Sequence, residues 1–176
     1  MEFINSMLSK LANDMSTGIG LRSIVEPSLV APTEPHLRIL PGSVILERKD
    51  NYAIREWGGK VYKATSYAAY MSIEVALQAW GNEEALKRVF FDYALRVSHY
   101  FELAKQFSIT GIREWDGSFV ADIKQLDNVF PDIEESDEGS GQTITLRTWA
   151  GYLVFDYYAI EAETARAKII DFHGGS

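Results

Sequence analysis

Five carboxylates in the last third of the chain form the densest group of side chains that could do chemistry: Asp132, Glu134, Glu135, Asp137 and Glu138. A pair of carboxylates can act as general acid and general base, and a larger group can hold Ca²⁺ or Mg²⁺. The stretch 132–141 ends in glycines, has no apolar wall that would perturb its carboxyl groups, and misses the spacing of an EF-hand loop. We therefore expect 132–141 to be a flexible, solvated acidic loop.

Other signatures of catalysis or cofactor binding are missing from the sequence. His36, His99 and His173 lie far apart, and none has the spacing of a zinc motif. There is no P-loop and no nucleophile elbow, and Gly18-Ile19-Gly20 neither follows a strand nor opens a helix. The absence of cysteine excludes disulfides and thiolate nucleophiles. We expect a protein that is not an enzyme and has no catalytic residues, cofactor or bound metal.

The composition is that of an ordinary globular protein. The 176 residues suit a single domain, 1–176, and an apolar content of 47% is enough to bury a core. No apolar stretch reaches the ~18–20 residues that span a bilayer, and the N-terminus lacks the features of a signal peptide. The net charge of −8 disfavours sequence-specific DNA binding, although an acidic wall would let a duplex slide past. Solubility is the simpler explanation of this charge.

The N-terminal part of the chain predicts a helix followed by an extended arm. Apolar residues recur at spacings of three and four over Phe3–Met15, and Gly18 and Gly20 follow. The segment 21–41 contains four prolines, which resist both helix and central strand. We expect this Pro-rich segment to be an arm with a strand piece at Ser23–Val25, lying on a neighbouring subunit or forming an ordinary surface connection. Its candidate contact residues are Val25, Pro27, Leu29 and Val30.

Short strands joined by tight turns are expected next. The pairs are His36–Leu40 with Val44–Glu47, around Pro41-Gly42, and Tyr52–Trp57 with Lys60–Thr65, around Gly58-Gly59. Apolar and polar residues then alternate along Tyr67–Trp80, which predicts a strand with one buried face.

The period changes to three and four over Glu83–Gln106, which predicts a long amphipathic helix that organises the core. Four further strands follow in the sequence, and then a short helix. They are Ile109–Trp115 and Ser118–Ile123 with a turn at Asp116-Gly117, Thr143–Trp149 and Tyr152–Ala159 with a turn at Ala150-Gly151, and the helix Glu161–Phe172. The predicted class is α+β, a mainly antiparallel sheet with the long amphipathic helix packed on one face and a short N-terminal helix.

A tetrapeptide occurs twice: Ile54-Arg55-Glu56-Trp57 returns as Ile112-Arg113-Glu114-Trp115. The match extends no further. We interpret it as two hairpins that meet similar demands, or as chance, and not as a duplicated domain.

The layout resembles that of bacteriophage tail terminator and tail-completion proteins of the head–tail neck. The resemblance is carried by the alternating strand up to Trp80, the polar turn, and the helix start Glu83-Glu84-Ala85-Leu86. The N-terminal helix, the extended passage after it and the aromatic strand Gly151–Ile160 agree with it. The longer proline arm and the insert Ser108–Gly141 depart from the family pattern.

The resemblance implies a virion structural protein, assembled in the host cytoplasm, that caps the tail tube and joins it to the head connector. It implies a ring, commonly of six copies, held by edge strands and the arm, with DNA only as passing cargo. The five acidic residues of 132–141 would then line the lumen or an interface. Two alternatives remain open: a small acidic inhibitor or immunity-type protein that masks a basic partner, and an enzyme built on two carboxylates.

Overall fold

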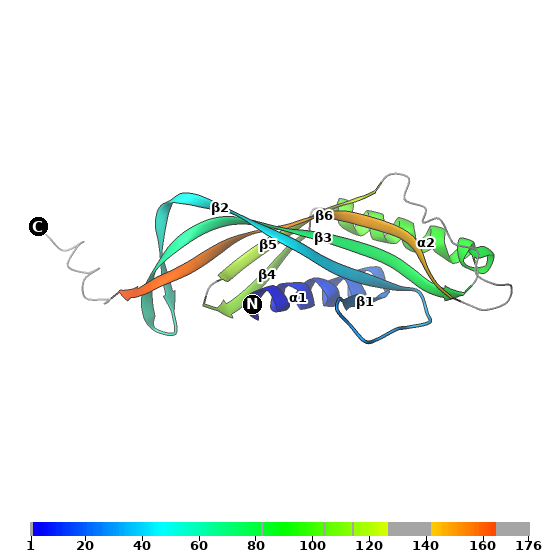
Figure 1. The fold of residues 1–176 in the computed structure, drawn as a ribbon, viewed down its shortest axis with the longest axis horizontal. Coiled ribbons are helices and arrows are strands. Elements are labelled where there is room, and N and C mark those ends of the chain that lie inside the picture. The colour runs from blue at the N-terminus through cyan, green and yellow to red at the C-terminus, as the bar shows by residue number, and fades with distance from the viewer. Residues whose placement is uncertain (1, 82, 104, 114, 127–141, 165–176) are drawn as a thin grey trace, which may run out of the picture.

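The fold is a single six-stranded sheet that curls into a half-barrel around the N-terminal helix (Figure 1). The computed structural model describes residues 2–81, 83–103, 105–113, 115–126 and 142–164. The strand order in the sheet is β1-β2-β3-β6-β5-β4. The elements in chain order are α1 Glu2–Ile19, β1 Arg22–Val25, β2 His36–Trp57, β3 Lys60–Gly81, α2 Glu83–Glu102, β4 Lys105–Ile112, β5 Trp115–Gln125 and β6 Gln142–Thr164.

Three very long strands dominate the sheet. β2, β3 and β6 have 22, 22 and 23 residues, and β3 pairs antiparallel with both of the others along its whole length. β5 pairs with β6 over Val120–Gln125, and β1 runs parallel to the first four residues of β2. A strand of 22 residues is about 70 Å long, so the sheet extends well beyond the part that the helices cover (Figure 1).

The core lies between the concave side of the sheet and α1. The alternation in the sequence places Met71, Ile73, Val75 and Leu77 of β3 on this side, and all four are buried. The buried face of α1 has the helical spacing Met7, Leu11, Met15. α1 contacts both β1 and β4, which are the two outermost strands, and therefore fills the opening of the half-barrel.

A cation–π contact shows how strongly the sheet curls. The guanidinium of Arg113, at the turn between β4 and β5, lies 4.4 Å from the centre of the Tyr62 ring in β3. β6 and β5 separate these two positions in the strand order, so the contact requires the sheet to bend back towards itself.

The predicted fold class, α+β with a long amphipathic helix on one face of the sheet, is wrong. The protein is mostly β, with two helices that are short beside its strands. α2 forms close to the predicted range, but its 20 residues span only about 30 Å, and Phe91 and Leu95 on it stay exposed. Periodicity identified the helix correctly, but it carries no information about the length of the strands around it.

Several predicted turns lie inside continuous strands. Pro41-Gly42 and Ala150-Gly151 lie within β2 and β6, and the turn of the β4–β5 hairpin falls after Ile112 and not at Asp116-Gly117. At Pro41-Gly42 the pairing shifts, which marks a β-bulge. Gly151 permits close approach of β5, because a Cβ there would lie 1.9 Å from the carbonyl oxygen of Asp122. These glycines relieve crowding inside long strands. A glycine-containing pair in the sequence is equally typical of a turn, so the sequence does not show which of the two roles it has.

Other predictions agree with the structure. α1 covers Phe3–Met15, β3 covers Tyr67–Trp80, and Gly58-Gly59 forms the predicted two-residue hairpin turn with φ values of 58° and 75°. The strand piece expected at Ser23–Val25 lies in β1. Of the predicted helix Glu161–Phe172, the first four residues belong to β6 and the others lie outside the described part.

Candidate assembly surface

The outer side of β2 is the most unusual surface of the described structure. β1 covers this side only at His36–Ile39. From Leu40 to Trp57, no described strand pairs with β2 there, so the alternate residues of this eighteen-residue stretch that point away from β3 present open backbone hydrogen-bonding groups. An open edge of this length is a template for pairing with another chain.

Apolar side chains are numerous along this open edge, which also carries three acidic and three basic residues. Exposed large hydrophobic residues on it are Leu40, Val44, Ile45, Leu46, Tyr52, Ile54 and Trp57. Ile45 and Ile54 are 53% and 59% exposed. Soluble monomers seldom expose so much apolar surface along one strand, so this edge is typical of a surface that another protein covers.

The local sequence explains how β2 extends so far. Two pairing irregularities, between Pro41 and Val44 and between Arg48 and Tyr52, let the strand follow the twist of β3 without breaking. The Gly58-Gly59 turn then returns the chain directly into β3. We call the part built from Leu40–Trp57, Lys60–Ile73 and Tyr152–Thr164 the ribbon.

The second margin of the ribbon is formed by β6. β5 pairs with β6 only up to Val154, and beyond it Phe155–Thr164 pairs with β3 alone among the described residues. The ring of Phe3 in α1 stacks on Tyr157, with centroids 5.1 Å apart, so α1 packs against a face of this strand. Within the described chain, both margins of the ribbon therefore lack a neighbouring strand.

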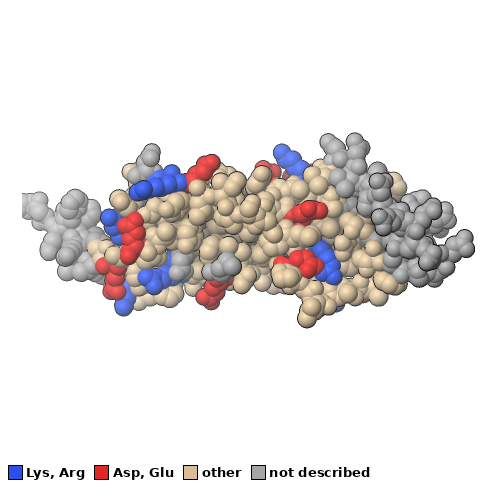
Figure 2. Space-filling view, in the orientation of Figure 1, with Lys and Arg blue, Asp and Glu red and all other residues tan. Residues whose placement is uncertain are grey.

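Charged side chains of both signs gather on the ribbon. On the face shown in Figure 2, blue and red residues concentrate towards the left end, which is the ribbon, while the middle of the face is mostly uncharged. Three ion pairs link its strands: Lys49 with Asp156, Lys60 with Glu163, and Lys63 with Glu161. Each acid in these pairs comes from β6, and all six side chains are between 40% and 59% exposed.

The Lys49–Asp156 pair has the shortest contact of the three. Lys49 Nζ donates to Asp156 Oδ1 at 2.6 Å, across the intervening strand β3. The hydrogen bond to Asp156 raises the pKa of Lys49 above its usual value. Because the pair is exposed, its contribution to stability is small, and its main effect is on the charge pattern of the ribbon.

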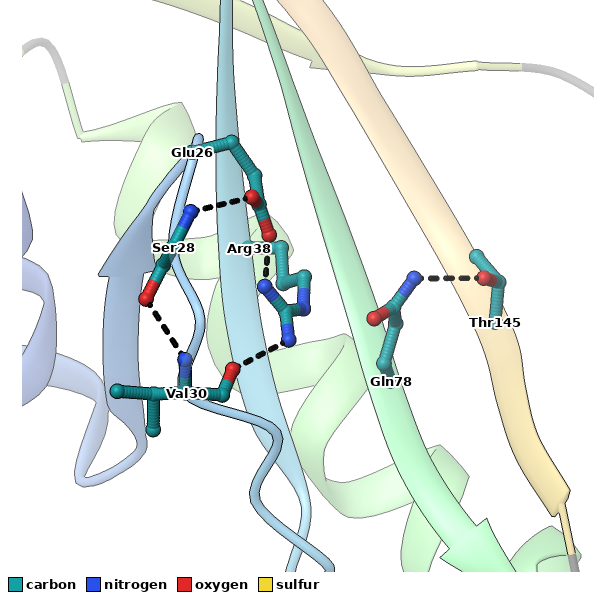
Figure 3. Close-up of polar contacts among 6 residues, drawn as sticks. All are labelled: Glu26, Ser28, Val30, Arg38, Gln78 and Thr145. Atoms are coloured by element: carbon teal, nitrogen blue, oxygen red, sulfur yellow. Dashed lines mark hydrogen bonds and ion pairs between the residues drawn. The ribbon is translucent and has the colours of Figure 1, made fainter.

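The Pro-rich segment folds onto its own chain (Figure 3). Arg38 of β2 forms an ion pair with Glu26 and donates to the carbonyl oxygen of Val30 at 2.7 Å. The amide of Ser28 donates to Glu26 at 2.8 Å, and that of Val30 donates to Ser28 Oγ at 3.2 Å. These contacts hold the loop after β1 against β2.

The four candidate contact residues of the Pro-rich segment lie at or near this loop, with different exposure. Val25 is half-buried against the core, and Pro27 is exposed after a cis peptide bond. Leu29 is fully exposed, and Val30 is 43% exposed. Leu29 and Val30 are therefore available to a partner, while Val25 belongs to the interior.

A groove of about 690 Å³ lies between α2 and β5. It is lined by Phe101, Trp149 and Val154 together with polar residues. Some of these polar groups bond to one another, since Trp149 Nε1 donates to Ser98 Oγ and Ser98 Oγ donates to Gln125 Oε1. These bonds orient side chains that pack between the helix and the sheet.

The described residues contain no group of three or more histidine, aspartate or glutamate side chains close enough to hold a metal ion. None of the described helices is both long and apolar enough to cross a membrane. The five acidic candidates of 132–141 lie outside the described residues.

Sequence reasoning missed the open edge of β2. The two halves of β2 were assigned to separate hairpins, so one continuous edge strand was not predicted. A signal was present, because apolar residues continue from Val44 to Leu46 and return at Ile54, with charged residues between them.

No family model matches the chain, and no curated protein is significantly similar to it.

Proposed function

We propose that this protein is a structural subunit that assembles with copies of itself through its ribbon. The observation that carries this proposal is the open edge of β2, eighteen residues long and rich in exposed apolar side chains. Adding a strand from another chain would satisfy its backbone groups and bury these side chains together.

The assembly we propose is the ring implied by the resemblance to tail terminator and tail-completion proteins. Such a ring would cap the tail tube, meet the head connector and let DNA pass through its opening. The net charge of −8 agrees with DNA as passing cargo, since an acidic protein does not retain a duplex. The loop at Leu29 offers a further contact for a neighbour or for a partner in the neck.

Light scattering and electron microscopy of the purified chain test the proposal. We expect a closed oligomer of about six copies, formed alone or on isolated tail tubes. The variant Ile45→Lys/Ile54→Lys places two charges on the open edge and should reduce the assembled fraction at least ten-fold. Leu95→Lys alters an exposed apolar residue on α2 and should assemble like the wild type.

A protein that stays monomeric at every concentration, with and without tail tubes, would contradict the proposal. A one-to-one complex with a basic protein would instead favour an inhibitor.

A further inference from the structure

We infer that neighbouring copies join head to tail, with the β2 margin of one ribbon against the β6 margin of the next. This inference rests on the proposed function and specifies which surfaces meet. The ribbon is three-stranded, β2-β3-β6, and among the described residues neither Leu40–Trp57 of β2 nor Phe155–Thr164 of β6 has a strand on its outer side.

The remaining edges of the sheet are poorer partners. β1 has only four residues. β4 has eight residues, compared with eighteen on the open part of β2. The margin Phe155–Thr164 has ten residues and continues directly from the sheet interior. Among the described strand edges, only the open part of β2 in a second copy is longer.

Charge favours β6 over a second β2 as the partner. The β6 margin carries Asp156, Glu161 and Glu163 and no basic residue. Each acid has a lysine of β2 or β3 in the same copy beside it, but two β6 margins would still bring only acids together at the joint. The open part of β2 carries three acidic and three basic residues, and its bases can meet these carboxylates. Lys49 and Asp156 already attract one another across β3 within one copy, so the same chemistry would act directly across the joint.

Strand directions fix the polarity of the joint. β2 and β6 are each antiparallel to β3, so they run in the same direction. Copies related by rotation about a ring axis therefore place β2 parallel to the neighbouring β6. Each copy then gives one margin and receives the other, and the ribbons merge into a continuous β wall around the opening.

The absence of cysteine from the chain permits a direct test by oxidative crosslinking. Ile54 of β2 is opposite Lys63 of β3, which is opposite Ala162 of β6. Within one copy these outer positions are two strand spacings apart, about 10 Å, which is too far for a disulfide. A disulfide between a cysteine placed at position 54 and one placed on the β6 margin therefore has to join two copies.

The experiment uses two double variants, Ile54→Cys/Ala162→Cys and Ile54→Cys/Ala159→Cys, because the tilt of strands in a closed wall shifts the register. We expect at least one of them to give a ladder of crosslinked species that ends at the number of copies in the ring. Its crosslinked fraction should exceed that of each single-cysteine variant at least ten-fold.

Two results would overturn the inference and leave the proposed function standing. The first is a crosslinked dimer from Ile54→Cys alone, which indicates two β2 strands related by a two-fold axis. The second is an oligomer of the expected size in which neither double variant forms a ladder. A chain that is monomeric by light scattering under all conditions would remove both the inference and the proposed function.

Discussion

Single residues of this protein act mainly by allowing long strands to approach one another. Gly151 is the clearest case, because a side chain there would run into the backbone of β5. The repeated Ile-Arg-Glu-Trp sequence has a related role. Arg55 lies over the ring of Tyr158 at 4.3 Å and Arg113 over that of Tyr62 at 4.4 Å, so both copies of the tetrapeptide fix a hairpin end onto a tyrosine.

The close approach at Gly151 predicts a large effect of one methyl group. We expect Gly151→Ala to lower the free energy of unfolding by about 1–3 kcal/mol, because β5 has to move away from β6. Gly117→Ala is the matched control, since a Cβ there meets nothing within 4 Å and its change should stay within about 0.5 kcal/mol. Urea unfolding measures the free energy of unfolding of both variants. Equal changes in the two would show that β5 moves away from β6 without loss of stability.

Tyr100 predicts a loss of stability at alkaline pH. Its hydroxyl donates to Asp14 at 2.6 Å, and burial, together with this hydrogen bond, raises the pKa of Tyr100 well above its usual value. The contribution of the Tyr100 hydroxyl to the free energy of unfolding is complete below the unfolded-state pKa of about 10. It is lost as the pH rises from there towards the folded-state pKa.

We expect this single group to cost about 1.4 kcal/mol of unfolding free energy at pH 11. The variant Tyr100→Phe should lack this part of the decline, while Tyr152→Phe, at an exposed position, should keep it. Urea unfolding at pH 8 and pH 11 separates the two variants. Equal declines of the free energy of unfolding in both variants would show that Tyr100 does not contribute to the alkaline loss of stability.

Among the elements, α1 has the largest effect on the shape of the sheet. The sheet of the described strands curls but does not close, and α1 occupies the opening between β1 and β4. Its buried face therefore replaces the strand pairing that a closed barrel would have. α2 has a smaller part, since only one side of it enters the core and Phe91 and Leu95 remain outside.

Shortening a buried side chain of α1 should consequently destabilise the entire fold. Leu11 is completely buried, and we expect Leu11→Ala to cost about 2–5 kcal/mol. Leu95→Ala on α2, where the side chain is 68% exposed, should cost less than about 0.5 kcal/mol. Thermal unfolding followed by circular dichroism compares them, and a small effect of Leu11→Ala would show that the sheet holds its curl without α1.

At the scale of the whole molecule, the core and the margins of the ribbon differ in what covers them. The core is closed by the described helices α1 and α2, whereas the ribbon has the two margins Leu40–Trp57 and Phe155–Thr164 that no described strand covers. Association would cover the ribbon, so stability and assembly should be linked in this protein.

That linkage predicts a melting temperature that depends on protein concentration. We expect the Tm of the wild type to rise as the concentration is raised a hundred-fold, because association stabilises the folded chain by mass action. The variant Ile45→Lys/Ile54→Lys should show a constant Tm over the same range. A constant Tm in the wild type as well would indicate that assembly does not bury the open edge.

The sequence by itself determined the local structure wherever one face of an element meets the core. The alternation along Tyr67–Trp80, the helical spacing over Phe3–Met15 and the Gly58-Gly59 turn were all assigned correctly. Each of these patterns records burial or backbone conformation over a few neighbouring residues, which is information that a short stretch of chain contains.

Only the tertiary structure decided that three strands run on for more than twenty residues and that the sheet curls. Pro41-Gly42 and Ala150-Gly151 have the composition of turns, yet the first lies at a bulge and the second accommodates a crowded neighbouring strand. Whether such a pair reverses the chain depends on the strands beside it, which come from distant parts of the sequence. The open edge of β2 is decided in the same way, because an edge exists only when the order of strands in the sheet is known.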